Sequence, residues 1–333
     1  MFSTKKQSKS VIKITDTHIS YITIQKEKSL FSIDKYEIID IPEGIIKYGE
    51  ILKADIFSKK IKEIQEKIEN KNVDVLLSHD LFLSHHGILG AKDQKQKPKK
   101  RIKNYLHNFS QVEPWQKSHI CEFETFTFDK KEHVLLTCLQ KDIQSSYFHL
   151  FKKSGLTIAS INSDMLAFGH LFSEGQSSVV CINDKDSCVI DFKDGMFIGH
   201  KEFQLSHAHL INDIMKDVSI NKEESLRVLE KYGVLRTHKD ERVYKRLHRS
   251  LASLLDYLKK RKTKPKSKIS VIYTTLPIKG LSDELSYSAG ENVDDFNIFN
   301  IKKYTFKEIL SLVKKDSYYY QSHIAQALRF WKK

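Results

Sequence analysis

Glycine is scarce in this sequence, with 12 residues in 333, whereas average usage of ~7% would give about twice that number. No apolar run approaches the ~20 residues that a membrane-spanning helix needs. The basic start, MFSTKKQSKS, is not followed by an apolar stretch of signal-peptide length. We therefore expect a protein that stays in the cytoplasm.

Cysteine is also rare, and its four residues form no C-x-x-C pair. Each of them falls in a strand-like run of the sequence. Such spacing argues against a disulfide framework or a zinc site. We expect reduced, partly buried thiols at Cys121, Cys138, Cys181 and Cys188.

Charge is the main excess, with a net charge of +14 from 56 basic and 42 acidic residues. A basic surface of this size can serve nucleic acid or an anionic membrane. Here the excess is mostly lysine spread along the chain among many isoleucines and asparagines, as an AT-rich genome tends to encode. We expect no nucleic-acid binding.

The two halves of the chain open in the same way. Alternating apolar residues predict a hairpin of Val11–Ile14 and Ile19–Gln25 and a third strand at Ser32–Asp40. A similar series starts at Val179, and its Asp194-Gly195 pair is a strong hairpin-turn signal. Two three-strand meanders in 333 residues are typical of a duplicated α/β domain.

A lysine-dense segment with one proline, AKDQKQKPKKRIKNYL, interrupts the first half. Strands at Ser118–Phe128 and His133–Leu139 and a helix at Lys141–Ser154, ended by Gly155, predict a small α+β lobe after it. The predicted division is a first half of residues 10–91, 154–177 and 317–333, an inserted lobe of 92–153, and a second half of 178–316 with a helical subdomain at about 206–265. Within the first half we also expect a helix from Ser163 to Phe172.

The order of these segments resembles the PilM family of type IV pilus assembly proteins. The segments that carry the resemblance are IPEGIIKYGEI, VEPWQKSHICEFETF, KKSGLTIASINSD and the helix Ser225–Gly233 ahead of a G-V-L sequence. The resemblance covers nearly the whole chain. It implies an α/β fold of duplicated actin-like (ribonuclease H-like) domains with an inserted α+β lobe.

In that family two D-x-G turns wrap the phosphates of ATP, and the resemblance places altered residues in both. The positions are Lys13, Thr15 and Asp16 in the first turn and Cys181, Asn183 and Asp184 in the second. Glycine lets backbone N–H groups approach the phosphates, and aspartate holds the metal. A cation and a thiol replace the two acids here, and we expect Lys13 to pair with Asp184 instead.

The third nucleotide loop of the family is a glycine run beside the adenosine. Here it reads Tyr273, Thr274 and Thr275. Leu226 and Leu229 stand where the family has a glutamate and a lysine around the adenosine. The resemblance therefore implies a degenerate nucleotide site, no enzymatic activity, and no cofactor, neither ATP nor magnesium.

The function implied by the resemblance is that of a cytoplasmic scaffold in a type IV pilus or related secretion machine. Such a scaffold binds the cytoplasmic tail of a bitopic PilN-type protein, which holds it at the inner membrane. We place the tail groove between the first half and the lobe, roughly at Lys92 to Lys103, where the basic run favours acidic partner segments. Contacts with a pilus motor and self-association stay open.

Three alternatives remain: an active actin-like ATPase, an FtsA-type polymer-forming division or cytoskeletal protein, and a type II secretion platform protein. The histidine pairs His85-His86 and His207 with His209 do not indicate a metal, because neighbours at such spacing do not converge on one ion. Ser206 is an expected helix N-cap. We expect no metal site.

The aromatic residues near the end of the chain are expected to pack the last helix, Ser317–Trp331, back on the first half. The terminal sequence LRFWKK also suits a membrane interface, since tryptophan and lysine are common there.

Overall fold

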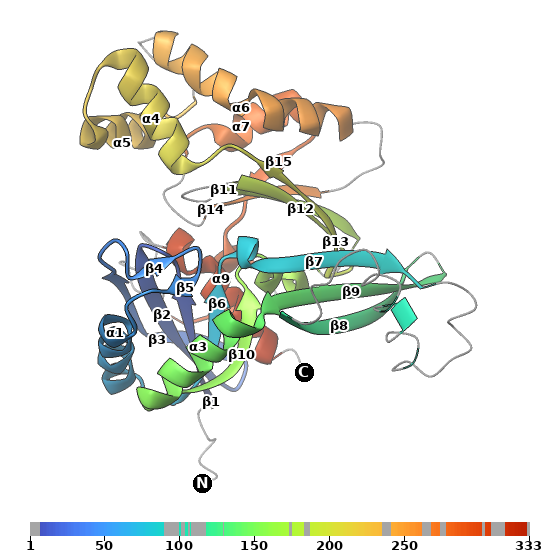
Figure 1. Ribbon diagram of the computed structural model, residues 1–333. Coiled ribbons are helices and arrows are strands. Elements are labelled where there is room, and N and C mark those ends of the chain that lie inside the picture. Colours follow the sequence, from blue (N-terminus) through green and yellow to red (C-terminus); the bar gives the residue numbers. More distant parts are fainter. Residues whose placement is uncertain are drawn as a thin grey trace.

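Two sheet-containing halves and a smaller lobe make up the molecule (Figure 1). The structure is a computed structural model, and it describes residues 7–89, 100, 104–105, 107, 118–128, 130–172, 175–182, 187–234, 241–261, 268–273, 278–301, 304–307 and 317–331. In the view of Figure 1 the second half lies above the first, and the lobe projects to one side.

The first half is built on a six-stranded mixed sheet in the order β10-β6-β1-β2-β3-β16. Its strands are β1 (Gln7–Ile14), β2 (His18–Glu27), β3 (Leu30–Asp40), β6 (Asn72–Leu77), β10 (Thr157–Ser163) and β16 (Thr305–Phe306). β1 pairs antiparallel with β2 and parallel with β6, and β10 is parallel to β6. The carboxyl ends of β1, β6 and β10 therefore meet at one edge, the edge at which open α/β sheets usually build their sites.

Helices cover both faces of this sheet. α1 (Ala54–Lys67) buries Phe57, Ile61 and Ile64 at helical spacing against one face. α3 (Lys141–Lys153) lies beside it, and the rings of Phe57 and Tyr147 meet edge to face at 5.8 Å. The other face carries the short 3-10 helix η4 (Leu166–Leu171) and the C-terminal helix α9 (Ser317–Phe330).

The second half has a five-stranded sheet in the order β13-β12-β11-β14-β15. Its strands are β11 (Gln176–Ile182), β12 (Ser187–Lys193), β13 (Met196–Phe203), β14 (Lys268–Tyr273) and β15 (Val293–Asp295). Its helices α4 (His207–Val218), α5 (Lys222–Lys231), α6 (Glu241–Arg261) and α7 (Leu281–Ala289) lie on the side away from the first half (Figure 1). The two predicted meanders, β1-β2-β3 and β11-β12-β13, are present and equivalent in pairing.

The lobe is a three-stranded antiparallel sheet in the order β7-β9-β8. Its strands are β7 (Phe82–Ile88), β8 (His119–Phe128) and β9 (Lys131–Gln140). Because β7 pairs with β9, the lobe begins about ten residues before the predicted boundary at residue 92. Cys121 and Cys138 face each other across β8 and β9 and form a disulfide. The expectation of reduced thiols is wrong for this pair, whereas Cys181 and Cys188 are free and buried.

Three further elements differ from the sequence-based expectations. Of the predicted helix from Ser163 to Phe172, only the 3-10 helix η4 forms. Its Gly169 packs closely on the β12–β13 turn, since a Cβ there would lie 2.6 Å from the carbonyl oxygen of Gly195. α7 is not among the elements expected from the sequence. β16 pairs with β3, so the chain returns to the first sheet within the range assigned to the second half.

The C-terminal helix packs on β1, β2 and η4, as expected. Tyr320 is buried against Tyr36, and the ring of Trp331 meets that of Phe31 at 5.3 Å. Trp331 Nε1 also donates a hydrogen bond to Gln7 Oε1 at 3.0 Å. These contacts with the first sheet explain the position of Trp331 without a membrane interface. Within the described part of the chain, no helix is long and apolar enough to cross a bilayer.

Candidate functional site

A buried ion pair lies at the edge where the strands of the first sheet end. Lys13 Nζ lies 2.7 Å from Asp164 Oδ2, and both side chains are more than nine-tenths buried. Lys13 comes from the end of β1, and Asp164 follows β10, where its N–H donates to the carbonyl of Leu77 at the end of β6. The parallel pairing of these three strands brings the two charges together.

A neutral histidine lies beside this pair. His323, on α9, is completely buried and forms hydrogen bonds through Nε2 with Ser20 Oγ at 3.0 Å and with the Ser20 carbonyl at 3.2 Å. Burial first, and then the positive charge of Lys13, lower the pKa of His323 to about 3. The histidine therefore stays uncharged at neutral pH, and the Lys13 charge is balanced by Asp164.

Two buried thiols of the second meander lie close to the Lys13–Asp164 pair. Cys181 and Cys188 are directly opposite each other on β11 and β12 and are both buried. The pKa of Cys181 is raised, first by burial and then by Cys188, with smaller effects of the Asp164 and Lys13 charges. Cys181 is thus a protonated thiol close to the ion pair, and it contacts the hydrophobic core that joins both halves.

A second buried ion pair lies farther back on the same strand. Lys9 Nζ lies 2.7 Å from Asp74 Oδ1, and Asp74 Oδ2 accepts a hydrogen bond from Gln326 Nε2 at 3.2 Å. Lys9 and Lys13 share one face of β1, because residues four apart in a strand point the same way. α9 contributes both Gln326 and His323 to this face, and so it completes the polar interior.

The turn after β1 is closed by its own side chains. Thr15 Oγ1 donates to the carbonyl of His18 at 3.0 Å. Asp16 accepts hydrogen bonds from the backbone N–H groups of Tyr48 at 3.1 Å and Gly49 at 3.3 Å. Asp16 therefore holds the turn between β4 (Ile46–Lys47) and β5 (Glu50–Ile51).

That β4–β5 turn has a demanding backbone. Tyr48 and Gly49 both have positive φ, 50° and 72°, as a two-residue type I′ hairpin turn requires. The Gly49 carbonyl accepts a hydrogen bond from the hydroxyl of buried Tyr147 on α3 at 3.1 Å. The turn is thus fixed from one side by the first half and from the other side by the helix that follows the lobe.

A groove of about 530 Å³ opens between this turn and the lobe. It is lined by residues of the β4–β5 hairpin, of η1 (His79–Leu81), of the lobe strands and of α3: Tyr48, Gly49, Glu50, Ile51, Asp80, Leu81, Leu83, His119, Gln140, Asp142, Ile143 and Ser146. Tyr48 and Leu83 expose 69% and 49% of their surface there. The lining combines three acids, Glu50, Asp80 and Asp142, with apolar side chains such as those of Tyr48 and Leu83.

The sequence-based prediction put the tail groove between the first half and the lobe, roughly at Lys92 to Lys103. Of that range the structure describes only Lys100, so the predicted role of the basic run lies outside the described residues. The described residues that line the groove include the acids Glu50, Asp80 and Asp142.

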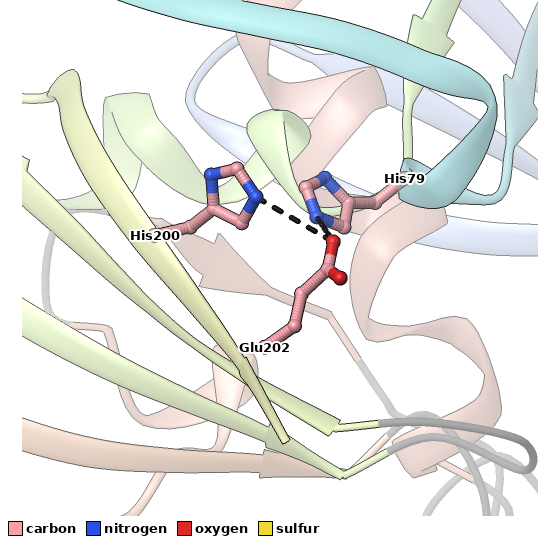
Figure 2. Close-up of side chains that lie close together, drawn as sticks. All are labelled: His79, His200 and Glu202. Carbon is pink, nitrogen blue, oxygen red and sulfur yellow. Dashed lines mark ion pairs between the residues drawn. The ribbon is translucent and has the colours of Figure 1, made fainter. Parts of the chain in front are cut away.

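A third cluster lies on the lobe side of the contact between the halves. His79 in η1 faces His200 and Glu202 on β13; the two imidazole rings meet edge to face, and one oxygen of the Glu202 carboxylate lies near both of them (Figure 2). His79 is 6% exposed, and neither of its ring nitrogens has a hydrogen-bond partner in the described structure. The pKa of His200 is lowered by burial and then by His79. Neither His79 nor His200 was singled out from the sequence.

Of the remaining predicted positions, the structure describes Leu226, Leu229 and Tyr273. Leu226 and Leu229 lie on α5 and pack in the core under the helical layer of the second half, Leu229 completely buried. The backbone of Tyr273 ends β14, next to Ile182. Asn183, Asp184, Thr274 and Thr275 lie outside the described residues, and the predicted pairing of Lys13 with Asp184 lies there too; the partner that the structure gives Lys13 is Asp164.

No protein-family model matches this sequence, and no curated protein matches it significantly. Among solved structures, a PilM-PilN type IV pilus biogenesis complex is similar with a TM-score of 0.77 and 12% identity, over 96% of this chain and 98% of the other. The ethanolamine utilization protein EutJ from Carboxydothermus hydrogenoformans gives a TM-score of 0.49 and 11% identity over 87% and 84% of the two chains. MreB5 of Spiroplasma citri bound to ADP gives 0.48 and 10% over 96% and 98%. The chain therefore has the actin-like fold, in the form found in a PilM-PilN complex.

Proposed function

We propose that this protein is a non-catalytic scaffold that binds the cytoplasmic tail of a bitopic inner-membrane protein of the PilN type, in a type IV pilus or type II secretion platform. The groove between the β4–β5 hairpin and the lobe is the observation that carries the proposal. Its lining comes from different parts of the chain, the β4–β5 hairpin and η1 on one side and the lobe strands and α3 on the other. The scaffold would be held at the membrane through that partner.

The groove suits a short extended tail with a particular chemistry. Such tails dock by main-chain hydrogen bonds and a few side-chain pockets. Tyr48 and Leu83 offer apolar contact, and Glu50, Asp80 and Asp142 favour a basic residue beside it. We therefore infer a tail that combines an aliphatic side chain with a lysine or arginine.

The proposed absence of catalysis rests on the groups that occupy the nucleotide position. Magnesium needs hard oxygen ligands, whereas Lys13 puts a buried ammonium at the end of β1 and Cys181 puts a protonated thiol at the end of β11. Asp164 is already paired with Lys13. Thr15 and Asp16 make hydrogen bonds within the protein and serve the turn and the groove. These residues do not fit Mg-ATP.

The partner proposal is tested with a fluorescent peptide that has the sequence of the cytoplasmic tail of the bitopic membrane protein encoded beside this chain. Tyr48→Asn keeps a residue that tolerates positive φ but removes the exposed ring. We expect a loss of tail affinity of at least about tenfold, or about 1.4 kcal/mol. Asp142→Lys should lower the affinity for a basic tail by charge repulsion, and it should make the affinity less sensitive to salt.

Tyr287→Asn is the matched control, because Tyr287 on α7 is 71% exposed, close to the 69% of Tyr48. It should leave the affinity unchanged. Equal binding by wild type, Tyr48→Asn and Asp142→Lys would show that the tail binds elsewhere. Separately, calorimetry with millimolar Mg-ATP should show no saturable binding. A micromolar isotherm would favour the active ATPase instead.

A further inference from the structure

The two halves of the molecule are brought together at a cluster of potential metal ligands. His79 Nε2 lies 3.7 Å and His200 Nε2 3.5 Å from the same oxygen, Glu202 Oε1. All three potential ligand atoms lie within 4.8 Å of one another. The side chains converge from η1 of the first half and from β13 of the second (Figure 2).

These separations are too long for good hydrogen bonds and suit a shared ion. An N–H···O hydrogen bond has a donor–acceptor distance of about 2.7–3.2 Å. Ligand atoms about 2.0–2.2 Å from one tetrahedral zinc ion lie about 3.4 Å apart. The two nitrogen–oxygen distances, 3.5 and 3.7 Å, are close to that spacing, and the wider limit of 4.8 Å for the whole set requires a small inward movement of one side chain on binding.

His79 supplies the second and independent observation. Its side chain is more than nine-tenths buried, yet Nδ1 and Nε2 both lack a hydrogen-bond partner in the part of the chain that the structure describes. A buried imidazole without partners loses the free energy of hydration of its polar atoms. Coordination of Nε2 by a cation would compensate for that loss.

We propose that His79, His200 and Glu202 bind a divalent transition-metal ion, with zinc as the best fit, and that the ion clamps the second half to the first. Two imidazole nitrogens and one carboxylate oxygen are a common ligand set for zinc, and water would complete the coordination. Glu202 is 64% exposed at its side chain, which leaves a path for the ion from solvent. The site is separate from the nucleotide position and does not depend on the proposed scaffold function.

The position of His79 also links this ion to the groove. His79, Asp80 and Leu81 form the single turn η1, and the latter two line the groove. An ion on His79 would restrain that turn. Metal binding would then order one wall of the groove as well as the contact between the halves.

The test is equilibrium dialysis of the chelator-treated full-length protein against zinc, followed by metal analysis. We expect one zinc ion per chain, with an affinity that falls at least tenfold in His200→Ala and in Glu202→Gln. Neither side chain is buried, so both variants should fold, as circular dichroism will verify. Cobalt loading should give visible d–d bands that the same two variants lose.

His209→Ala is the control for binding to surface imidazoles, because His209 is 53% exposed and lies 3.6 Å from a carboxylate, Asp213. It should keep both the stoichiometry and the affinity of the wild type. Absence of zinc and cobalt binding by the wild type would overturn the proposal. Unchanged affinity in both His200→Ala and Glu202→Gln would overturn it as well.

Discussion

Removing one charge of the Lys13–Asp164 pair should destabilise the protein far more than removing one charge of a surface pair. Lys13→Met leaves the Asp164 carboxylate buried, 5% exposed at its side chain, without its cation. Breaking a buried pair in this way typically costs about 3–5 kcal/mol of the free energy of unfolding. Asp164→Leu should cost a similar amount, because it leaves the ammonium unpaired.

The double variant decides between charge and packing. Lys13→Met combined with Asp164→Leu removes both charges and keeps apolar volume, so it should lie within about 1 kcal/mol of wild type. The interaction free energy from the double-mutant cycle should then be several kcal/mol. A pure packing role would instead give two losses that add.

The matched control is the exposed pair of Lys307 and Glu27. Its N–O distance is 2.8 Å, almost that of the buried pair, but the side chains are 46% and 39% exposed. Lys307→Met should therefore cost at most about 1 kcal/mol. The assay is urea unfolding near pH 7, followed by circular dichroism and tryptophan fluorescence to check that the transitions coincide. A loss below about 1 kcal/mol in Lys13→Met would refute the reasoning.

Three further predictions concern other contacts. The pKa of His323 is about 3 in the folded protein, so between about pH 6.5 and pH 3 only the unfolded chain carries the proton. The free energy of unfolding should therefore fall by about 1.4 kcal/mol for each pH unit below about 6.5. His323→Gln should remove this contribution to the pH dependence, measured by urea unfolding at several pH values. Asp16→Ala should weaken tail binding about tenfold in the peptide assay, because the β4–β5 turn loses two hydrogen bonds; unchanged binding would show that the turn needs no tether. Ser206→Ala should cost about 1 kcal/mol in unfolding experiments by removing the N-cap bond to the His209 N–H.

The fold was largely predictable because its signals are local. The two meanders follow from strand alternation, and their turns follow from residues such as Asp194 and Gly195, whose φ values are 49° and 85°. The N-cap at Ser206 follows from its residue type in the same way. Elements that depend on long-range contact were missed. β16 is two residues long and is a strand only because it lies beside β3.

The sites were predicted less well, since they depend on which chain segments meet. Lys13 was recognised as a changed position, but its partner follows β10, some 150 residues away, and no spacing rule relates the two. His79 and His200 are isolated histidines about 120 residues apart in the sequence, and no spacing rule relates them. The Cys121–Cys138 disulfide depends on the register of β8 and β9, which the sequence does not specify.

The return of the chain to the first sheet has a consequence for synthesis on the ribosome. β16 and α9 follow the second half in the sequence, yet β16 pairs with β3 and α9 covers the face of β1 that carries Lys9 and Lys13. Until they emerge, the nascent chain exposes an unfinished sheet with apolar and charged side chains on one face. Such surfaces are prone to aggregation during folding. The second half, whose sheet is complete by β15, can therefore fold before the first half, whose sheet also needs β16.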